Sequence, residues 1–124
     1  MSLPCGPDLA SKKCRPCEGG VPRYSAAEAE QQLGQLRGWR LTHDAQRIRR
    51  DWAFKSFKAA MQFLNQVAAL AEAEGHHPDL HLERYRHVWI ELWTHAVGGL
   101  SENDVIMAAK IDQVEPGGTT NDER

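Results

Sequence analysis

Residues 72–104 read EAEGHHPDLHLERYRHVWIELWTHAVGGLSEND and contain the main signals for the predicted fold. A helical pattern ends at Gly75, and Pro78 prevents the helix from resuming because proline has no backbone donor. Two short strand-like runs follow, and then the start of another helix. Imidazoles and carboxylates therefore lie at the ends of regular elements, where side chains are held in position yet reach solvent: His76, His77, His95, Glu72 and Asp104. This arrangement suggests acid–base chemistry on a small molecule.

The two runs predict strands at 80–85 and 87–94. The second strand has aliphatic residues on one face and Trp89 and Trp93 on the other. Because strand side chains alternate between the faces of a sheet, the aliphatic face belongs to the core under the helices. The tryptophan face carries too much apolar surface for a free monomer. We expect another subunit or the N-terminal arm to cover it in part.

The rest of the chain shows patterns of the same kind. Helical periods and capping boxes predict helices at 25–37, 56–74 and 101–114, and period-two alternation predicts strands at 39–41 and 46–54. Gly38 is placed for the left-handed residue that ends the first helix. Hairpin-connected strands form a mainly antiparallel sheet, and amphipathic helices need its apolar face. The sequence therefore predicts an α+β, two-layer domain, in which a four-stranded antiparallel sheet has three helices packed on one face.

Two surfaces of this predicted domain concern assembly. The helix at 56–74 has an apolar face wider than one sheet would cover, which is typical of helix contacts between subunits. On the strand at 46–54, Arg47, Arg49 and Asp51 share the face opposite the core. We expect that face to be solvated or at an oligomer edge rather than to form a binding patch.

Composition excludes several classes of function. The 124-residue chain is 41% hydrophobic and 26% charged, as ordinary globular domains are, and its 15 basic and 17 acidic residues give a net charge of −2. There is no basic stripe of the kind that nucleic-acid binders show. No apolar run approaches the length of a membrane span, and the N-terminus lacks the pattern of a signal peptide. We therefore expect a cytoplasmic protein with neither a nucleic-acid nor a membrane partner.

Proline and glycine punctuate the N-terminus and predict three regions: an irregular arm at 1–24, the domain at 25–114 and a disordered tail at 115–124. The arm contains all three cysteines, an odd number that argues against a disulfide framework. Cys14 and Cys17 have the spacing of half a structural zinc site. Cys5, together with His43 or a group from another subunit, would have to complete it. The alternative is an exposed arm with ordinary thiols.

The histidines suit proton transfer. Histidine titrates near neutral pH, so two or three of them around a polar heterocycle fit a reaction such as the elimination of water. From the residues alone, capping of the preceding helix is an equally good interpretation of His76 and His77. A metal site on the histidines is disfavoured, because adjacent imidazoles point in different directions and Pro78 interrupts any helical spacing. The chain also lacks a nucleophile-elbow sequence and a glycine-rich phosphate loop.

The pattern Glu72-x3-His76-His77-Pro78-x6-Tyr85-x9-His95-x8-Asp104 resembles the signature of the pterin-4a-carbinolamine dehydratases. The similarity runs from Gly38-Trp39 to the last helix, and residues 13–22 resemble an N-terminal extension of some bacterial members. The resemblance implies a four-stranded antiparallel sheet with helices on one face, assembled as a homodimer or homotetramer. It also implies dehydration of 4a-hydroxytetrahydropterin to quinonoid dihydropterin. That reaction recycles the cofactor of an aromatic amino acid hydroxylase and needs no metal or organic cofactor.

Residue by residue, the resemblance implies that His76, His77 and His95 are catalytic and surround the pterin. His76 and His95 would exchange protons with the 4a-hydroxyl group and N5, while His77 would hold the ring. Asp104 would orient His95 and raise its basicity, as carboxylates do for catalytic histidines. Glu72 would fix the histidine pair from the preceding helical turn.

Pro78 would set the backbone that separates the two imidazole directions. The chain departs from the family pattern at Gly75, where some members have an acidic residue, and at Leu80, where an aromatic residue is common. The lost aromatic residue would weaken stacking on the pterin, but neither change affects the three histidines.

Two other functions are compatible with the resemblance. Animal members of the family also serve as dimerisation cofactors of a homeodomain transcription factor, which is a non-catalytic, protein-interaction role. A family member can also act on another pterin, for example in molybdopterin metabolism. Histidine substitutions would abolish an enzymatic function and leave a scaffold function intact.

Overall fold

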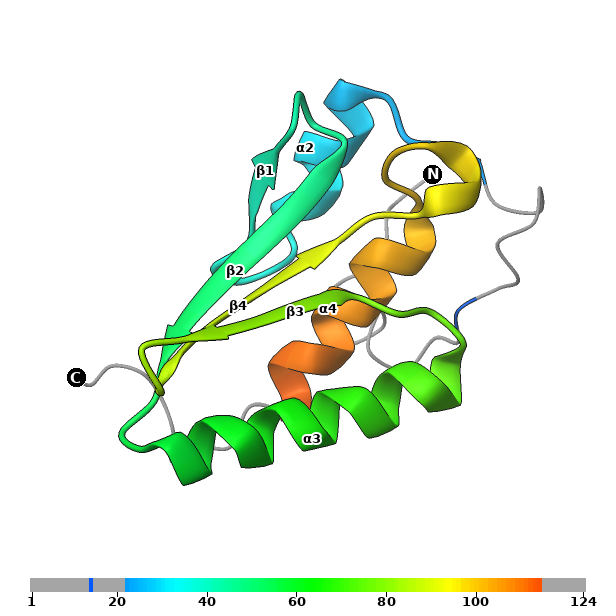
Figure 1. Ribbon diagram of the computed structural model, residues 1–124. Coiled ribbons are helices and arrows are strands. Elements are labelled where there is room, and N and C mark those ends of the chain that lie inside the picture. Colours follow the sequence, from blue (N-terminus) through cyan, green and yellow to red (C-terminus); the bar gives the residue numbers. More distant parts are fainter. Residues whose placement is uncertain (1–13, 15–21, 115–124) are drawn as a thin grey trace.

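The computed structural model describes Cys14 and residues 22–114. The elements, in chain order, are α2 (Ala26–Leu33), β1 (Arg40–Thr42), β2 (Arg47–Ala53), α3 (Phe57–Glu74), β3 (Asp79–Glu83), β4 (His87–Leu92), the 3-10 helix η1 (His95–Val97) and α4 (Glu102–Val114). Figure 1 shows their arrangement. Apart from Cys14 and residues 22–24, the predicted N-terminal arm lies outside the described residues, as does the predicted tail.

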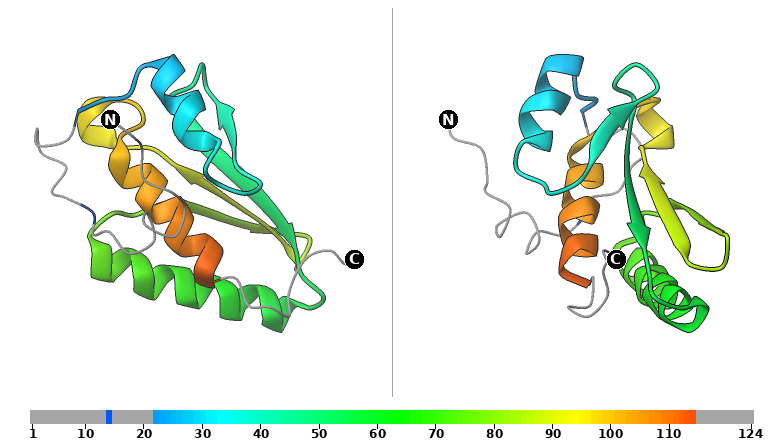
Figure 2. Two further views of the ribbon diagram at one scale, coloured as in Figure 1. Left: turned by 180° about the vertical axis from the view of Figure 1, so that it is seen from behind. Right: turned by 90° about the vertical axis from the view of Figure 1, so that its left-hand side faces the viewer.

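The four strands form one antiparallel sheet in the order β1-β2-β4-β3. Two hairpins, β1–β2 and β3–β4, are joined through the central pairing of β2 with β4, which sets Ile48 opposite Leu92 and Trp52 opposite Val88. Helices α2, α3 and α4 lie on the same side of this sheet (Figure 2). The structure therefore confirms the predicted α+β class and the four-stranded antiparallel sheet with its three helices.

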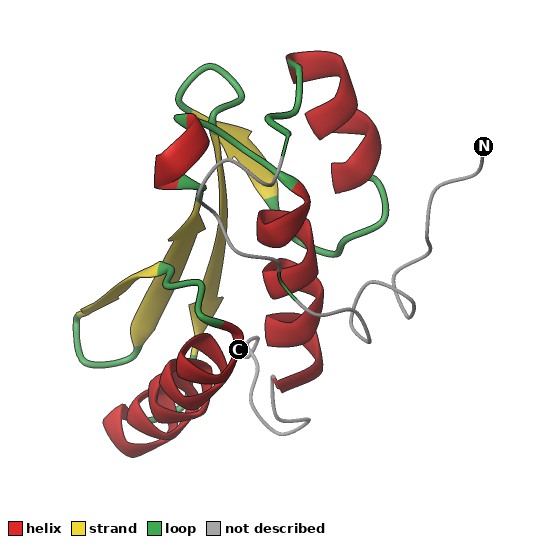
Figure 3. Cartoon of the chain, turned by 90° about the vertical axis from the view of Figure 1, so that its right-hand side faces the viewer, coloured by secondary structure: helices red, strands yellow, loops and turns green. Residues whose placement is uncertain are grey.

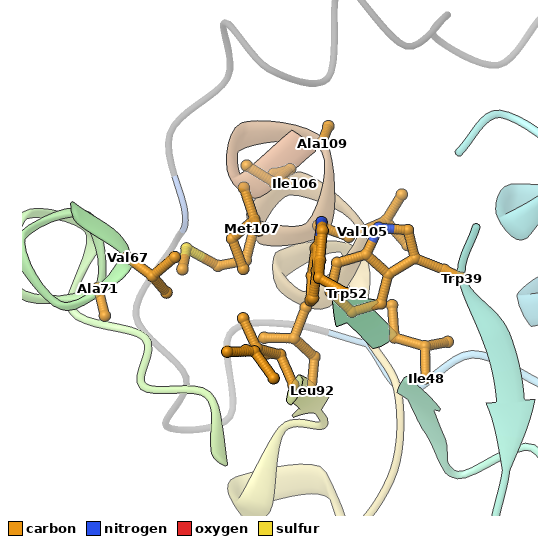
Figure 4. Packing of buried hydrophobic residues seen from close by; sticks show 14 of the residues in the cluster. Trp39, Ile48, Trp52, Val67, Ala71, Leu92, Val105, Ile106, Met107 and Ala109 are labelled. Atoms are coloured by element: carbon orange, nitrogen blue, oxygen red, sulfur yellow. The ribbon is translucent and has the colours of Figure 1, made fainter. Parts of the chain in front are cut away.

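The core lies between the inner face of the sheet and helices α3 and α4. Trp52 and Phe54 of the β2 segment both contact the ring of Phe63 from α3, with centroids 4.9 and 5.1 Å apart. Figure 4 shows Met107 of α4 between Val67 of α3 and Trp52 of β2. All five side chains are at most 2% exposed. Burial on this scale is the main favourable term in folding, and it holds the two helices against the sheet.

The first helix is shorter than predicted. It ends at Leu33, and Gly34 is its C-cap residue, whereas the sequence predicts a helix to residue 37. Gly38 has the expected positive φ, 80°, but it lies in the turn before β1. The chain leaves the helix early because Trp39 packs edge-on against Trp52, with ring centroids 5.9 Å apart. This tertiary contact outweighs three further residues of helical pattern.

The outer face of the sheet is partly covered by its own side chains. The guanidinium carbon of Arg49 lies 3.8 Å from the centroid of Trp89, and that of Arg47 lies 4.4 Å from the centroid of Trp93. The ring of His81 stacks on Trp89 at 3.5 Å. Arg47 and Arg49 thus lie on the outward face, as predicted. They are not simply solvated, because their guanidinium groups cover the two tryptophans. Additional cover by another subunit or by the N-terminal arm stays a prediction.

None of the helices in the described part of the chain has the length and apolar character needed to cross a membrane.

Candidate active site

The end of α3 sets the position of the histidine pair. Gly75 has a left-handed φ of 69°, and its N–H donates to the carbonyl of Ala71 at 2.9 Å. The N–H of His76 also donates to the carbonyl of Ala71, at 3.3 Å. A glycine in this conformation ends a helix without the steric cost that a Cβ atom would add. The chain therefore turns sharply, and His76 is directed back toward the helices.

His76 forms a buried pair with Asp104. Nε2 of His76 lies 2.7 Å from Oδ1 of Asp104, and the two residues are 5% and 0% exposed. Oδ2 of the same carboxylate accepts hydrogen bonds from the Thr94 hydroxyl at 2.8 Å and from the Ser101 backbone N–H at 2.9 Å. Asp104 is thus anchored on both oxygens, which makes it a rigid support for the imidazole.

The network also determines which nitrogen of His76 bears the proton. An ionised carboxylate only accepts hydrogen bonds, so Nε2 of His76 donates to Asp104. The Thr94 hydroxyl likewise donates its proton to Asp104, so the Ser101 hydroxyl donates to Thr94, at 2.7 Å.

His77 has a different environment from its neighbour. Its Nε2 lies 2.8 Å from Oε2 of Glu72, on the last turns of α3, and the side chains are 63% and 78% exposed. Exposed pairs of this kind contribute at most about 1 kcal/mol to stability, because solvent screens them. Glu72 therefore orients His77 alone, since Asp104 holds His76. The sequence-based expectation that Glu72 fixes both His76 and His77 is therefore wrong for His76. Pro78 follows them, half-buried, before β3.

His95 lies in η1, in the connection from β4 to α4 (Figure 3). The backbones of Thr94 and Gly99 close this connection, with the Thr94 N–H donating to the Gly99 carbonyl at 2.8 Å. The His95 side chain is exposed, and its ring lies on Trp93 with centroids 4.0 Å apart and 31° between the planes. The predicted support of His95 by Asp104 is wrong, because that carboxylate binds His76.

The end of α3, η1 and the start of α4 all lie at the right-hand side of Figure 1. Asp104 connects them: it binds His76 after α3 and Thr94, the residue that directly precedes His95. One buried imidazole and two exposed imidazoles, His77 and His95, are thereby attached to one framework. A set of this kind supplies both a supported base and solvent-accessible proton donors.

Sequence reasoning missed Thr94 and Ser101 as partners of the carboxylate. The signal was present in part, because the predicted capping box at 101–104 pairs a serine with an acidic side chain three residues later. The Ser101 N–H does bind the Asp104 carboxylate as such a box requires. The other oxygen of the Asp104 carboxylate, Oδ1, binds His76, which is 28 residues away in the sequence. This contact is set by the tertiary structure and not by the local pattern.

Cys14 lies against the same region. Its N–H donates to Oε1 of Glu74 at 2.8 Å, and its thiol lies 3.7 Å from the carbonyl of Asn103. Burial raises the pKa of the Cys14 thiol to about 12, and the negative charge of Glu74 adds to this effect. The thiol is therefore protonated and buried, so the alternative of exposed, ordinary thiols is wrong for this residue.

The predicted zinc site involves residues beyond the structure, since Cys5 and Cys17 lie outside the described residues. Within Cys14 and residues 22–114, no group of three or more histidine, cysteine, aspartate or glutamate side chains is arranged to hold a metal ion.

Comparison with known proteins identifies the family. The family model for pterin 4 alpha carbinolamine dehydratase matches residues 22–114, which include the whole described sheet and all three helices. The chain belongs to the pterin-4a-carbinolamine dehydratase family. This confirms the resemblance that the spacing of Glu72, His76, His77, His95 and Asp104 indicated.

Individual members of the pterin-4a-carbinolamine dehydratase family agree with this assignment. The mitochondrial pterin-4-alpha-carbinolamine dehydratase 2 of Arabidopsis thaliana is 47% identical over 111 residues, which cover 87% of this chain and 59% of the plant protein. This chain thus spans about three fifths of the length of that relative. A relative from Nitrosomonas eutropha, named "putative pterin-4-alpha-carbinolamine dehydratase", is 49% identical over 108 residues, covering 86% of this chain and 93% of its own.

Two solved structures are also similar to this chain. A transcriptional coactivator/pterin dehydratase from Brucella melitensis has a TM-score of 0.71 and 33% identity, covering 77% of this chain and 100% of its own. A pterin dehydratase-like protein, described as a RuBisCO assembly factor in the alpha-carboxysome, has a TM-score of 0.55 and 27% identity, covering 67% of this chain and 93% of its own.

Proposed function

We propose that this protein catalyses the dehydration of a 4a-hydroxytetrahydropterin to the quinonoid dihydropterin. The family assignment supports the substrate class. The observation that carries the chemistry is the buried His76–Asp104 pair, 2.7 Å apart, on the same framework as the exposed His77 and His95. Buried carboxylate–imidazole pairs are a common way to prepare a histidine for proton transfer.

The reaction needs one base and one acid. The C4a–O bond breaks, the hydroxyl group takes up a proton and leaves as water, and N5 loses its proton as the C4a=N5 double bond forms. Imidazole can serve in both roles near neutral pH because its ordinary pKa is close to the working pH. No electron acceptor or donor is consumed.

The environments of the histidines differ enough to divide these roles. His76 is the proposed base for the N5 proton, because the Asp104 carboxylate on Nε2 stabilises the imidazolium that forms. His95, exposed and without a carboxylate partner among the described residues, is the proposed proton donor to the 4a-hydroxyl group. His77, held by Glu72, is proposed to bind the pterin ring.

A coupled assay tests this function. An aromatic amino acid hydroxylase generates the carbinolamine, and absorbance follows the appearance of quinonoid dihydropterin. We expect the native protein to accelerate dehydration and the variants His76→Ala and His95→Ala each to lose most of that acceleration. His43→Ala is the matched control, because His43 is an exposed histidine in the β1–β2 turn.

The outcomes separate three possibilities. If both histidine variants keep the native rate, the catalytic roles are wrong and the activity stands. If the native protein does not accelerate the reaction, the proposed function is wrong. Repetition of the assay with pterins that differ in their side chains identifies the accepted substrate, including one outside aromatic hydroxylation.

Assembly is part of the same proposal. The α3 residue Phe57 is 54% exposed, which is unusual for a large aromatic side chain and supports a homodimer or homotetramer through this helix. Light scattering of the native protein and of Phe57→Glu tests this, and an unchanged mass would contradict it. Coupling to a hydroxylase and a cytoplasmic location remain predictions of the sequence analysis. The name of the Arabidopsis relative assigns that protein to mitochondria. A purely non-catalytic scaffold is not favoured.

A further inference from the structure

We infer that Trp93 is a positioning residue for His95, and that Arg47 holds Trp93 in place from the neighbouring strand. This inference rests on the proposed function, because it concerns the proposed proton donor of that reaction. It assigns a role to the outer face of the sheet, which neither the core nor the carboxylate network explains.

The three histidines differ in what orients them. His76 has Asp104 at 2.7 Å, and His77 has Glu72 at 2.8 Å. Within the described residues, the ring nitrogens of His95 have no hydrogen-bond partner. Its ring lies against the indole of Trp93, at 4.0 Å between centroids and 31° between planes. An exposed imidazole without such a contact would sample several rotamers. Trp93 is therefore the group that restricts His95.

The position of Trp93 is set by packing against the faces of its ring and not by a hydrogen bond. Its indole nitrogen is buried and has no hydrogen-bond partner among the described residues, so packing alone determines where the ring lies. Arg47 supplies that packing, with its guanidinium carbon 4.4 Å from the indole centroid. A guanidinium over an indole face is a favourable electrostatic contact.

Arg47 is fixed in turn by the sheet. Its Nη1 lies 3.3 Å from Oε1 of Glu91, whose side chain is only 10% exposed. The pairing of Ile48 with Leu92 sets Arg47 and Trp93, the next residue on each strand segment, beside each other on the outer face. The sheet register thus builds a continuous stack from Glu91 through Arg47 and Trp93 to His95.

The chain contains a matched control for this stack. Trp89 lies on the same strand and the same face, under Arg49 at 3.8 Å, and it stacks on a different histidine, His81, at 3.5 Å. Replacement of Trp89 therefore removes the same ring and a similar arginine contact without touching His95. If both tryptophan variants lose the same amount of activity, the loss comes from damage to the sheet and not from the contact with His95.

The test compares Trp93→Leu with Trp89→Leu in the full chain, by kinetics and by NMR of the histidine rings. We expect Trp93→Leu to lower kcat roughly 10- to 100-fold with little change in KM, because misplacement of a catalytic group by about 1 Å has effects of that size. Trp93→Phe should recover most of the rate, since it keeps an aromatic face. Trp89→Leu should stay within about threefold of the native kcat, because His95 keeps its support.

The NMR measurement does not depend on activity. The His95 ring protons, assigned with a His95→Gln variant, should lose the ring-current shift of the indole in Trp93→Leu and keep it in Trp89→Leu. Equal kcat values for the two leucine variants, or unmoved His95 signals in Trp93→Leu, would overturn the inference. An inactive native protein would remove the proposed function and, with it, the catalytic purpose of the contact. The NMR comparison would still decide whether Trp93 orients His95.

Discussion

Nε2 of His76 donates to Oδ1 of Asp104 across 2.7 Å in the interior of the protein, while Oδ2 accepts from Thr94 and Ser101. One carboxylate therefore connects the end of α3, the end of β4 and the start of α4. The pair is consequently both a structural junction and the centre of the candidate site. Its loss should affect stability and catalysis together.

Replacement of Asp104 by asparagine should destabilise the protein by about 3 kcal/mol, because the buried donors around it lose a charged acceptor. The amide can satisfy His76 or the Thr94–Ser101 pair, but it cannot accept from all three donors. We also expect kcat to fall by about 100-fold or more, since His76 loses the support of its imidazolium. Urea denaturation and the coupled assay measure the two effects. Asp44→Asn, at an exposed turn, is the control, and a stable, fully active Asp104→Asn would contradict the proposed role.

Replacement of Gly75 by alanine should cost about 1–2 kcal/mol, because φ of 69° is left-handed and disfavours a Cβ atom. The space around that Cβ is open, so backbone strain is the whole cause. Relief of the strain would move His76, and the rate should fall more than for Gly34→Ala, where φ is ordinary helical. Thermal denaturation gives the stability change. Equal Tm values for the two variants would show that Gly75 does not need its conformation.

Asp51 should make the protein acid-sensitive. Burial acts to raise the pKa of this carboxyl, but hydrogen bonds from Arg49 and His87 and the charges of Arg49 and Arg40 outweigh it and lower the pKa to about 2. The unfolded chain therefore binds more protons than the folded one between pH 4 and pH 2. The contribution of Asp51 is present above the ordinary pKa of the carboxyl and is lost as the pH falls through that window. Because solvent screens this network, we expect a contribution of about 1 kcal/mol.

The measurement is the free energy of unfolding of the native protein and of Asp51→Asn at pH 2 to pH 6. The native curve should fall more steeply below pH 4. Parallel curves would show that the carboxyl is not stabilised by its neighbours. Sodium chloride at high concentration should reduce the difference, because Arg40 and part of the network are exposed.

Cys14 should be unreactive in the folded protein, since its thiol is buried and its pKa is raised to about 12. The background of Cys5→Ser and Cys17→Ser isolates this thiol for labelling with a disulfide reagent. We expect labelling at neutral pH only as fast as the chain opens locally, and at full rate in denaturant. The free energy of unfolding should decrease as the pH rises from about 9 to 12, because the unfolded thiol ionises first. Rapid labelling of the native protein would contradict the docked position of Cys14.

Local patterns were enough to predict the framework. The alternation of aliphatic residues in β4 identified its buried face, since Val88, Ile90 and Leu92 are fully buried. The apolar stripe of α3 identified Ala60 and Val67 correctly, but Phe57 at its start is exposed. Patterns of this kind are readable because burial of one face imposes a period on the sequence. The end of α2 was misplaced, because the packing of Trp39 on Trp52 is invisible to a helical period.

The candidate site also has features that the local sequence determines and features that depend on tertiary packing. The sequence by itself determined the α+β order, the end of a helix at Gly75 and the position of Asp104 in the first turn of a helix, since each depends on residues within a few positions. Only the tertiary structure decided that Asp104 supports His76 rather than the nearer His95, and that Trp93 lies under His95. Those contacts depend on how the β3–β4 hairpin returns the end of α3 to the start of α4 and on the register between β2 and β4. Neither distance nor register is encoded in any short stretch of the chain, because both result from packing the whole core.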